Sequence, residues 1–261
     1  MGILAGKNAI IYGGAGSIGA GVARTFAREG AHVHLVGRTQ ESLDIAASEI
    51  ANARGQVDVA AFDALDESAV QAHVERVVAE HGSVDVTLNL IRRGDVQGTP
   101  LVDMTADQLL EAVDVGLRSN FITSRAAARH MSKQGSGVVL HLNSASGAGA
   151  MPGMGSTGPA DAATETYMRY LAAELGPAGV RVCGIWTAGV EESLTDRKIS
   201  DVSGEGNPGA EAALQMIASM AALRRPPRLA DVAETAAFLA SDYASGITGT
   251  MTNVTCGLVL R

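Results

Sequence analysis

A glycine-rich turn near the N-terminus has the residue types that hold a phosphate group. The stretch AIIYGGAGSIGAGVARTFA sets Gly13, Gly16 and Gly19 between an apolar run of strand length and a segment of helical period. Backbone N–H groups of such a turn, together with the N-terminus of the following helix, can bind a pyrophosphate. The sequence therefore predicts a nucleotide site here, with Ser17 and Ile18 inside the same turn.

The second apolar run ends in VGRT and has a basic side chain at the position where dinucleotide sites distinguish NAD from NADP. An NAD site usually presents an acid at this point to the ribose 2′-hydroxyl, whereas this chain has Gly37 followed by Arg38. A guanidinium can pair with a 2′-phosphate, so Arg38 favours NADP over NAD. The alternative is a solvated Arg38 beside Thr39, with Thr39 as the N-cap of the next helix.

Apolar runs of strand length alternate with segments of helical period along the chain. The runs are NAIIY, HVHLV, VDVAAF, VDVTLNLI, GVVLHLN, VRVCGIW and TMTNVT. This alternation predicts an α/β fold, in which a parallel sheet is covered on both faces by helices. We see no linker or repeat, so we expect one domain over residues 1–261. A polar, Gly-broken segment at about 190–228 could be a mobile flap over the substrate side or an ordinary surface excursion.

Composition and charge limit the partners. The chain is 46% hydrophobic and 18% charged, which indicates a large interior, and its net charge of -8 disfavours nucleic acid. Residues 134–160 carry no charge, but glycines and prolines interrupt them, so we expect no membrane span. Cys183 and Cys256 lack the spacing of a metal site, and we expect buried thiols and no metal. The N-terminus has no secretory pattern, and we expect a cytoplasmic location.

The order and spacing of several motifs resemble the short-chain dehydrogenase/reductase family over nearly the whole length. The matching stretches are GGAGSIG, FDALDES, SVDVTLN, GSGVVLHLNSASG, LAAELGPAGVRV and RRPPRLADVAETAAFLASDYASGITGTMTNV. The resemblance implies a three-layer doubly wound Rossmann fold with a seven-stranded parallel sheet in the order 3-2-1-4-5-6-7. It also implies a homotetramer whose main dimer contacts come from long helices around residues 105–132 and 161–175.

The resemblance assigns further cofactor residues and exposes departures from the family pattern. Asp63, with Ala64 beside it, would contact adenine, and Asn89 would steady the central strand. Ser17 replaces the middle glycine of the phosphate turn, which is tolerable where φ stays negative. NADP is therefore the expected cofactor, NAD is less favoured, and a site without any cofactor stays open.

A larger departure follows Asn89, where the family's NNAG becomes Asn89, Leu90, Ile91 and Arg92. Three small or polar positions beside the cofactor have become bulky. Arg92 and Arg93 could reach a phosphate or an acidic substrate, but we expect both to point into water.

The catalytic positions depart most. In the family a Tyr donates the proton, a Lys four residues later lowers its pKa and holds the ribose, a Ser binds the carbonyl oxygen, and an Asn positions a water. Gapless counting from the flanking motifs puts Thr157, Asp161 and Gly116 at the Tyr, Lys and Asn positions, and only Ser144 is retained. A Thr hydroxyl is a far poorer proton donor than a phenol, and a nearby carboxylate makes its ionisation harder still. We therefore expect the standard proton relay to be absent.

Asp161 offers an alternative chemistry. In an apolar cleft its pKa would rise, and it could serve as an acid or a base. It could equally accept hydrogen bonds from ribose hydroxyls, or cap its own helix, which we expect to begin after Pro159. Among nearby candidates we expect His141 in the core and packing roles for Tyr167, Tyr170 and, against the flap, Trp186.

Three functions remain open at this stage. The first, which the sequence favours, is an atypical NADP-dependent oxidoreductase acting on a small apolar carbonyl compound or a conjugated enone. The second is a non-catalytic subunit that forms a hetero-oligomer with an active paralogue. The third is a non-redox isomerase, cyclase or lyase with Asp161 as its acid or base.

Overall fold

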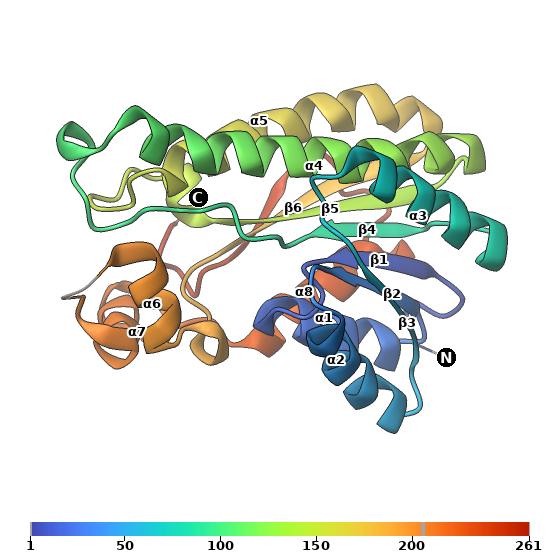
Figure 1. Ribbon diagram of the computed structural model, residues 1–261, viewed down its shortest axis with the longest axis horizontal. Helices are drawn as coiled ribbons and strands as arrows, with labels where there is room; N and C mark the ends of the chain where they lie inside the picture. Colours follow the sequence, from blue (N-terminus) through green and yellow to red (C-terminus); the bar gives the residue numbers. More distant parts are fainter. Residues whose placement is uncertain (1, 205–206, 261) are drawn as a thin grey trace.

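Seven parallel strands form one sheet in the order β3-β2-β1-β4-β5-β6-β7 (Figure 1). The computed structural model describes residues 2–204 and 207–260. The strands are β1 (Asn8–Tyr12), β2 (His32–Gly37), β3 (Gln56–Ala61), β4 (Val86–Asn89), β5 (Gly137–Ser144), β6 (Val180–Thr187) and β7 (Met251–Val254). The predicted strand order is therefore confirmed.

Helices cover both faces of this sheet. They are α1 (Ser17–Arg28), α2 (Gln40–Asn52), α3 (Glu67–His81), α4 (Ala106–Gln134), α5 (Thr157–Leu175), α6 (Asp196–Ser203), α7 (Gly209–Met220) and α8 (Leu229–Ala240). Helices α1, α2 and α8 lie on one face, and α3, α4 and α5 lie on the other (Figure 1). Their buried side chains form one hydrophobic core on each face. Successive residues of a strand point to opposite faces, so Ile11 lies in the first core and Ile10 in the second. The three predicted layers are confirmed.

The carboxyl ends of the central strands meet at one edge of the sheet. Tyr12 of β1 is in register with Asn89 of β4, and β5 continues to Ser144, which pairs with Thr187 of β6. The strand order reverses between β1 and β4, where open α/β sheets bind their ligands. The loops after β1, β4 and β5 therefore carry the candidate site.

Two long helices with well-defined ends flank that edge. Thr105 caps α4 in a capping box with Gln108, and α4 ends at Gly135, whose φ of 75° is left-handed. The expectation that α5 begins after Pro159 is wrong, because α5 begins at Thr157. Pro159 lies in the first turn, where the missing N–H has no partner inside the helix. Asp161 consequently lies inside α5 and does not cap it.

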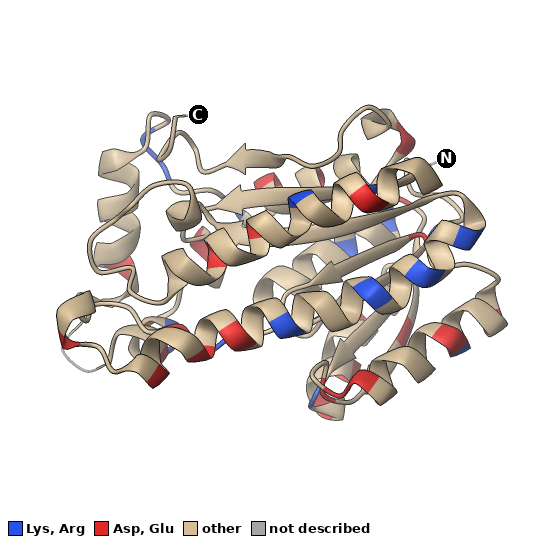
Figure 2. Ribbon diagram, turned by 90° about the horizontal axis from the view of Figure 1, so that it is seen from above, with Lys and Arg blue, Asp and Glu red and all other residues tan. Residues whose placement is uncertain are grey.

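Acidic and basic residues are separated along the length of α4 (Figure 2). Asp107, Glu111 and Asp114 come first along the helix, and Arg118, Arg125, Arg129 and Lys133 follow them. Anions near the N-terminus and cations near the C-terminus complement the helix dipole. Among helices within the described residues, none combines the length and apolarity needed to cross a bilayer.

The segment at about 190–228 carries α6 and α7 at one end of the molecule (Figure 1). The loop after β4 holds α6 through an ion pair of 2.8 Å between Arg92 and Asp201 and a hydrogen bond of 2.7 Å from the Gln97 N–H to the Val202 carbonyl. The mobility expected of this segment stays a prediction, and residues 205–206 within it lie outside the described residues.

Candidate active and cofactor site

The turn after β1 needs glycine at two positions. Gly13 has a left-handed φ of 76°, and a Cβ there would lie 2.6 Å from the Leu90 carbonyl oxygen. A Cβ at Gly19 would lie 2.3 Å from the Gly13 carbonyl oxygen, so the first turn of α1 can approach the loop only without a side chain. Ser17 has no positive φ and is exposed, which meets the condition under which it can replace a glycine.

The N-terminus of α1 has the properties of a phosphate cradle. Its N-cap, Gly16, provides no side-chain cap, and the first turn contains no acid. The free N–H groups of Ser17 and Ile18 therefore face the loop with no negative charge beside them. Arg38 follows the last residue of β2, is exposed, and forms no ion pair with another described residue.

The other predicted cofactor residues lie on neighbouring strand ends. Asp63 is exposed after β3, where its Oδ1 accepts a hydrogen bond of 2.9 Å from the Leu65 N–H, and Ala64 is buried. Asn89 is buried and joins two elements. Its amide donates to Ser119 Oγ of α4 at 3.0 Å, and its Oδ1 accepts from the Ile91 N–H.

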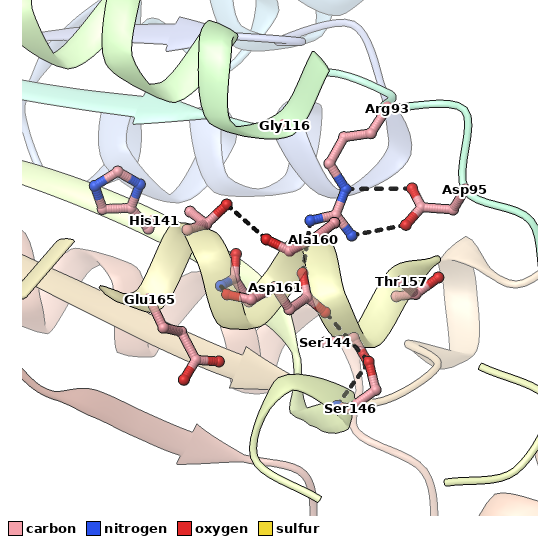
Figure 3. Close-up of polar contacts among 12 residues, drawn as sticks. Arg93, Asp95, Gly116, His141, Ser144, Ser146, Thr157, Ala160, Asp161 and Glu165 are labelled. Carbon is pink, nitrogen blue, oxygen red and sulfur yellow. Dashed lines mark hydrogen bonds and ion pairs between the residues drawn. The ribbon is translucent and has the colours of Figure 1, made fainter. Parts of the chain in front are cut away.

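Arg93 points into the molecule, so its expected outward orientation is wrong. Its Nη1 lies 2.6 Å from Asp161 Oδ1, and its Nε and Nη2 donate to Asp95 at 3.3 and 2.8 Å (Figure 3). The side chain of Arg93 is 15% exposed and that of Asp161 is fully buried. Arg92 does point outward, as expected, and is 69% exposed.

Gly116 of α4 makes this orientation of Arg93 possible (Figure 3). A Cβ at position 116 would lie 2.7 Å from Arg93 Cδ, well inside van der Waals contact. Arg93, Gly116 and Asp161 therefore fit together: Arg93 fills the space left by the missing side chain at Gly116, and its guanidinium pairs with Asp161. The cleft still contains a permanent cation, supplied by the loop after β4 and not by α5.

Burial dominates the electrostatics of this pair. It raises the pKa of Asp161 to about 6, the direction expected for a carboxyl group in an apolar cleft, and the Arg93 charge limits the rise. Burial also opposes the charge of Arg93, but the carboxylates of Asp161 and Asp95 outweigh it and raise the pKa of Arg93. Arg93 thus stays cationic, while Asp161 can exchange a proton near neutral pH.

The three predicted catalytic side chains are held by different partners. Thr157 is buried, and its Oγ1 accepts a hydrogen bond of 3.1 Å from Gln97 Nε2. Ser144 Oγ is half-buried and accepts from the Ser146 N–H at 3.2 Å. Asp161 instead meets Ser146, whose Oγ donates to Oδ2 at 3.3 Å. Among the hydrogen bonds of the described residues, none joins Ser144, Thr157 and Asp161 to one another.

Sequence reasoning missed Asp95, Gln97 and Ser146. The spacing of Arg93 and Asp95 was a usable signal, because an acid two residues away in a loop can hold a guanidinium. Nothing in the sequence marks Gln97 or Ser146, whose contacts depend on how the loops after β4 and β5 pack on α5.

The remaining candidates are structural. His141 is 2% exposed, binds Asn120 Oδ1 at 2.8 Å and has a pKa lowered to about 4 by burial, so the predicted core histidine is confirmed. Tyr167 packs against Phe121, but Tyr170 is 69% exposed, and its expected packing within this chain is wrong. Trp186 is half-buried and donates to Glu165 Oε1 at 2.7 Å. Both cysteines are free and buried, as expected.

Comparison with known proteins decides the family. The model of the family described as enoyl-(acyl carrier protein) reductase matches residues 13–259. The chain belongs to the short-chain dehydrogenase/reductase family. The 3-oxoacyl-(acyl-carrier-protein) reductase FabG of Chlamydia muridarum is 28% identical over 257 residues, 98% of each chain. The oxidoreductase UcpA of Salmonella typhimurium is 30% identical over 262 residues, 100% of this chain and 97% of the relative.

Solved structures of the family show the same fold. Carveol dehydrogenase from Mycobacterium avium, in complex with NAD, superposes with a TM-score of 0.90 over the whole of both chains at 23% identity. NAD⁺-bound xylitol dehydrogenase has a TM-score of 0.86 at 23% identity, covering 97% of this chain and 99% of its own. The family is one of oxidoreductases, and these two structural neighbours hold NAD.

The raised pKa of Asp161 predicts how stability depends on pH. Because the folded state binds this proton more tightly, the resulting stabilisation is complete below the ordinary pKa of 3.8 and is lost as pH rises through about 6. Between these two pH values, the unfolding free energy of the wild type should fall by up to ~3 kcal/mol relative to that of Asp161→Asn. This figure is the free energy that corresponds to a pKa shift of about two units. Urea unfolding of both proteins at a series of pH values measures the difference.

Asp114→Asn is the matched control for this measurement. Asp114 is exposed on α4, and its hydrogen bond to Arg118 lowers its pKa, so the wild type should gain stability over this variant as pH rises. A pH-independent difference for Asp161→Asn, or one with the sign of the control, would contradict the burial argument.

The fit between Gly116 and Arg93 predicts a coupled effect. An alanine inside a helix gains about 0.5–1 kcal/mol over glycine, but overpacking costs about 1–3 kcal/mol. We expect Gly116→Ala to lower the unfolding free energy by ~1 kcal/mol in the wild type and to raise it in an Arg93→Ala background. Gly176→Ala, where no atom lies within 4 Å of the added Cβ, should behave alike in both backgrounds. An unchanged effect of Gly116→Ala on removal of Arg93 would contradict the fit.

Proposed function

We propose that this chain is an NADP(H)-binding oxidoreductase that acts without the family's Tyr/Lys proton relay, on a small apolar carbonyl compound or a conjugated enone. The observation that carries this proposal is the contrast between the nucleotide-binding part and the catalytic part of the candidate site. The phosphate turn keeps Gly13 and Gly19, where a side chain would clash, and it keeps a free helix N-terminus. The first turn of α5 instead carries a buried acid paired with Arg93.

The residues around the turn fit the adenosine phosphate half of NADP. The N–H groups at the start of α1 would hold the pyrophosphate, and Arg38 would pair with the 2′-phosphate. Asp63 and Ala64 would lie at the adenine. When bound, NADPH would supply a hydride to a substrate carbon. NAD is the less favoured ligand, because the end of β2 provides no acid for a 2′-hydroxyl.

Ser144 is the side chain best suited to meet the substrate. Its Oγ accepts a hydrogen bond from the Ser146 N–H, so its own proton is free to be donated to a carbonyl oxygen. Thr157 and Asp161 are buried, so neither would present a proton at the surface of the cleft.

This arrangement suits a conjugated enone. Hydride would add to the β-carbon, the C=C electron pair would shift to form an enolate at the oxygen held by Ser144, and water would protonate the α-carbon. None of these reaction steps requires a tyrosine as proton donor. The burial of Asp161 weighs against the isomerase, cyclase or lyase alternative, in which its carboxyl group would have to touch the substrate.

A second candidate is a non-catalytic subunit that pairs with an active paralogue. A specific observation favours it: Arg93, Asp95 and ionised Asp161 together carry one net negative charge, which opposes an anionic transition state.

Self-association through α4 is also part of the proposal. A second copy packed antiparallel on α4 would set the acidic N-terminal part of one helix against the basic C-terminal part of the other.

Arg38 provides the test of the cofactor. A charge-assisted hydrogen bond contributes about 1.5–3 kcal/mol, so Arg38→Ala should raise the Kd for NADPH about 10- to 100-fold. The Kd for NADH should change little, because NADH has no 2′-phosphate. Arg129→Ala, an exposed change on α4, should leave both values unaltered. Fluorescence titration measures both constants, and an equal loss for the two nucleotides would contradict the assignment.

Ser144 provides the test of the reaction. Loss of one donor to a developing oxyanion typically lowers kcat about 100-fold or more, and we expect this for enone reduction by Ser144→Ala, with an unchanged Kd for NADPH. Asp161→Asn should lower kcat far less. A larger loss in Asp161→Asn would favour the acid–base alternative. Saturable NADPH binding without turnover of any enone or carbonyl tested would favour the non-catalytic subunit.

A further inference from the structure

Three histidines and an aspartate gather at the edge of the sheet opposite to the nucleotide turn. His32 and His34 lie on β2, Asp58 lies on β3, and His81 is the last residue of α3. One ligand atom from each residue lies within 4.8 Å of the others. These residues play no part in the site described above.

The three distances between Asp58 and the histidines are close to those of a tetrahedral metal site. Zn²⁺ binds imidazole nitrogen at about 2.0–2.1 Å and carboxylate oxygen at about 2.0–2.2 Å, so tetrahedral ligand atoms are separated by about 3.3 Å. Asp58 Oδ2 lies 2.8 Å from His32 Nε2, 3.5 Å from His34 Nδ1 and 3.5 Å from His81 Nε2. Small rotations of the side chains would bring all four atoms onto one ion.

The orientation of the rings also favours a shared ion over pairwise hydrogen bonds. Among the hydrogen bonds of the described residues, none joins Asp58 to these imidazoles, although the atoms are close. The ring centroids of the three histidines lie 4.4 to 4.8 Å apart. Their nitrogens thus converge on a common space.

His34 is the most buried member of the cluster, with its side chain 2% exposed, and it faces the other members through Nδ1. Its other ring nitrogen, Nε2, is buried and has no hydrogen-bond partner in the described residues. An ion at Nδ1 would give this buried ring a partner on the side that faces the cluster.

We propose that His32, His34, Asp58 and His81 form a zinc-binding site. Three imidazoles and one carboxylate in tetrahedral arrangement are a donor set for Zn²⁺. His32, Asp58 and His81 are each partly exposed, which gives the ion a path of entry.

The site is structural in character. β3 is an edge strand with one neighbour, β2, and an ion at Asp58 would tie the middle of β3 to β2 and to the end of α3. His32 begins β2 and Arg38 follows its end, so about six residues at ~3.3 Å each, or ~20 Å, separate the ion from the proposed 2′-phosphate position. The ion would therefore hold the sheet without contacting the cofactor.

Zinc titration of the whole protein tests this proposal. Protein free of a histidine tag and stripped of metal would compete with a chromophoric chelator for Zn²⁺, and we expect one ion per chain. His81→Gln and Asp58→Asn should each weaken binding about 10-fold or more, since even partners outside the ligand set are worth 10- to 100-fold. Both positions are partly exposed, and each variant should fold.

His130→Gln, the same change on α4 outside the cluster, is the matched control and should bind Zn²⁺ as the wild type does. Co²⁺ should give the intense visible bands of a tetrahedral site, and added Zn²⁺ should raise the Tm of the wild type but not of His81→Gln. The proposal is overturned by absence of Zn²⁺ binding, by equal weakening in His130→Gln, by wild-type affinity in both cluster variants, or by an octahedral Co²⁺ spectrum.

Discussion

The buried ion pair between Arg93 and Asp161 is the interaction on which the candidate site depends. Removing one partner of a buried pair leaves an uncompensated charge and typically costs about 3–5 kcal/mol. Arg93 can occupy its place only because position 116 has no side chain. Positions 93, 116 and 161 therefore depend on one another. A lysine at 161 would place an ammonium against the guanidinium, so no single substitution restores the family arrangement.

The same pair fixes what chemistry remains. Asp95 holds two nitrogens of Arg93 and Asp161 holds a third, which leaves the guanidinium few donors for a ligand. Arg93 consequently neutralises α5 and anchors the loop after β4, and it is poorly placed to replace a lysine that holds ribose. In the proposed function, polarisation of the substrate is therefore assigned to Ser144, and an enone is preferred to a simple ketone because it needs no strong acid at its oxygen.

Most of the fold could be predicted from the sequence, because its signals are local or follow in order along the chain. Strand-length apolar runs, a glycine turn and a set of ordered motifs lead directly to the sheet order that is observed. The interior of the site could not be predicted in the same way. The orientation of Arg93 depends on space at Gly116 and on charge at Asp161, which approach it only in the folded chain. An isolated arginine after a strand is normally solvated, and that expectation failed for Arg93 but not for Arg92.

The histidine cluster illustrates a different limit of sequence reasoning. The alternation in HVHLV puts His32 and His34 on one face of β2, because residues two apart in a strand share a face. Asp58 reaches the same face only because β2 and β3 pair in a register that sets His34 beside it. A search for metal sites by cysteine spacing cannot find this cluster, because its members are three histidines and an aspartate.

Strand β2 runs from the histidine cluster at its amino end to Arg38, which follows its carboxyl end. Arg38 and Asp63, on which adenosine binding would rest, follow the carboxyl ends of β2 and β3, the two strands that the cluster joins near their amino ends. β3 is held by β2 alone on its sheet side, and much of it is exposed. Anything that fixes the pairing of these two strands at one edge also fixes the relative positions of Arg38 and Asp63 at the other. A link at the amino edge can therefore preorganise the adenosine pocket without touching it, since strands in fixed register transmit position along their length.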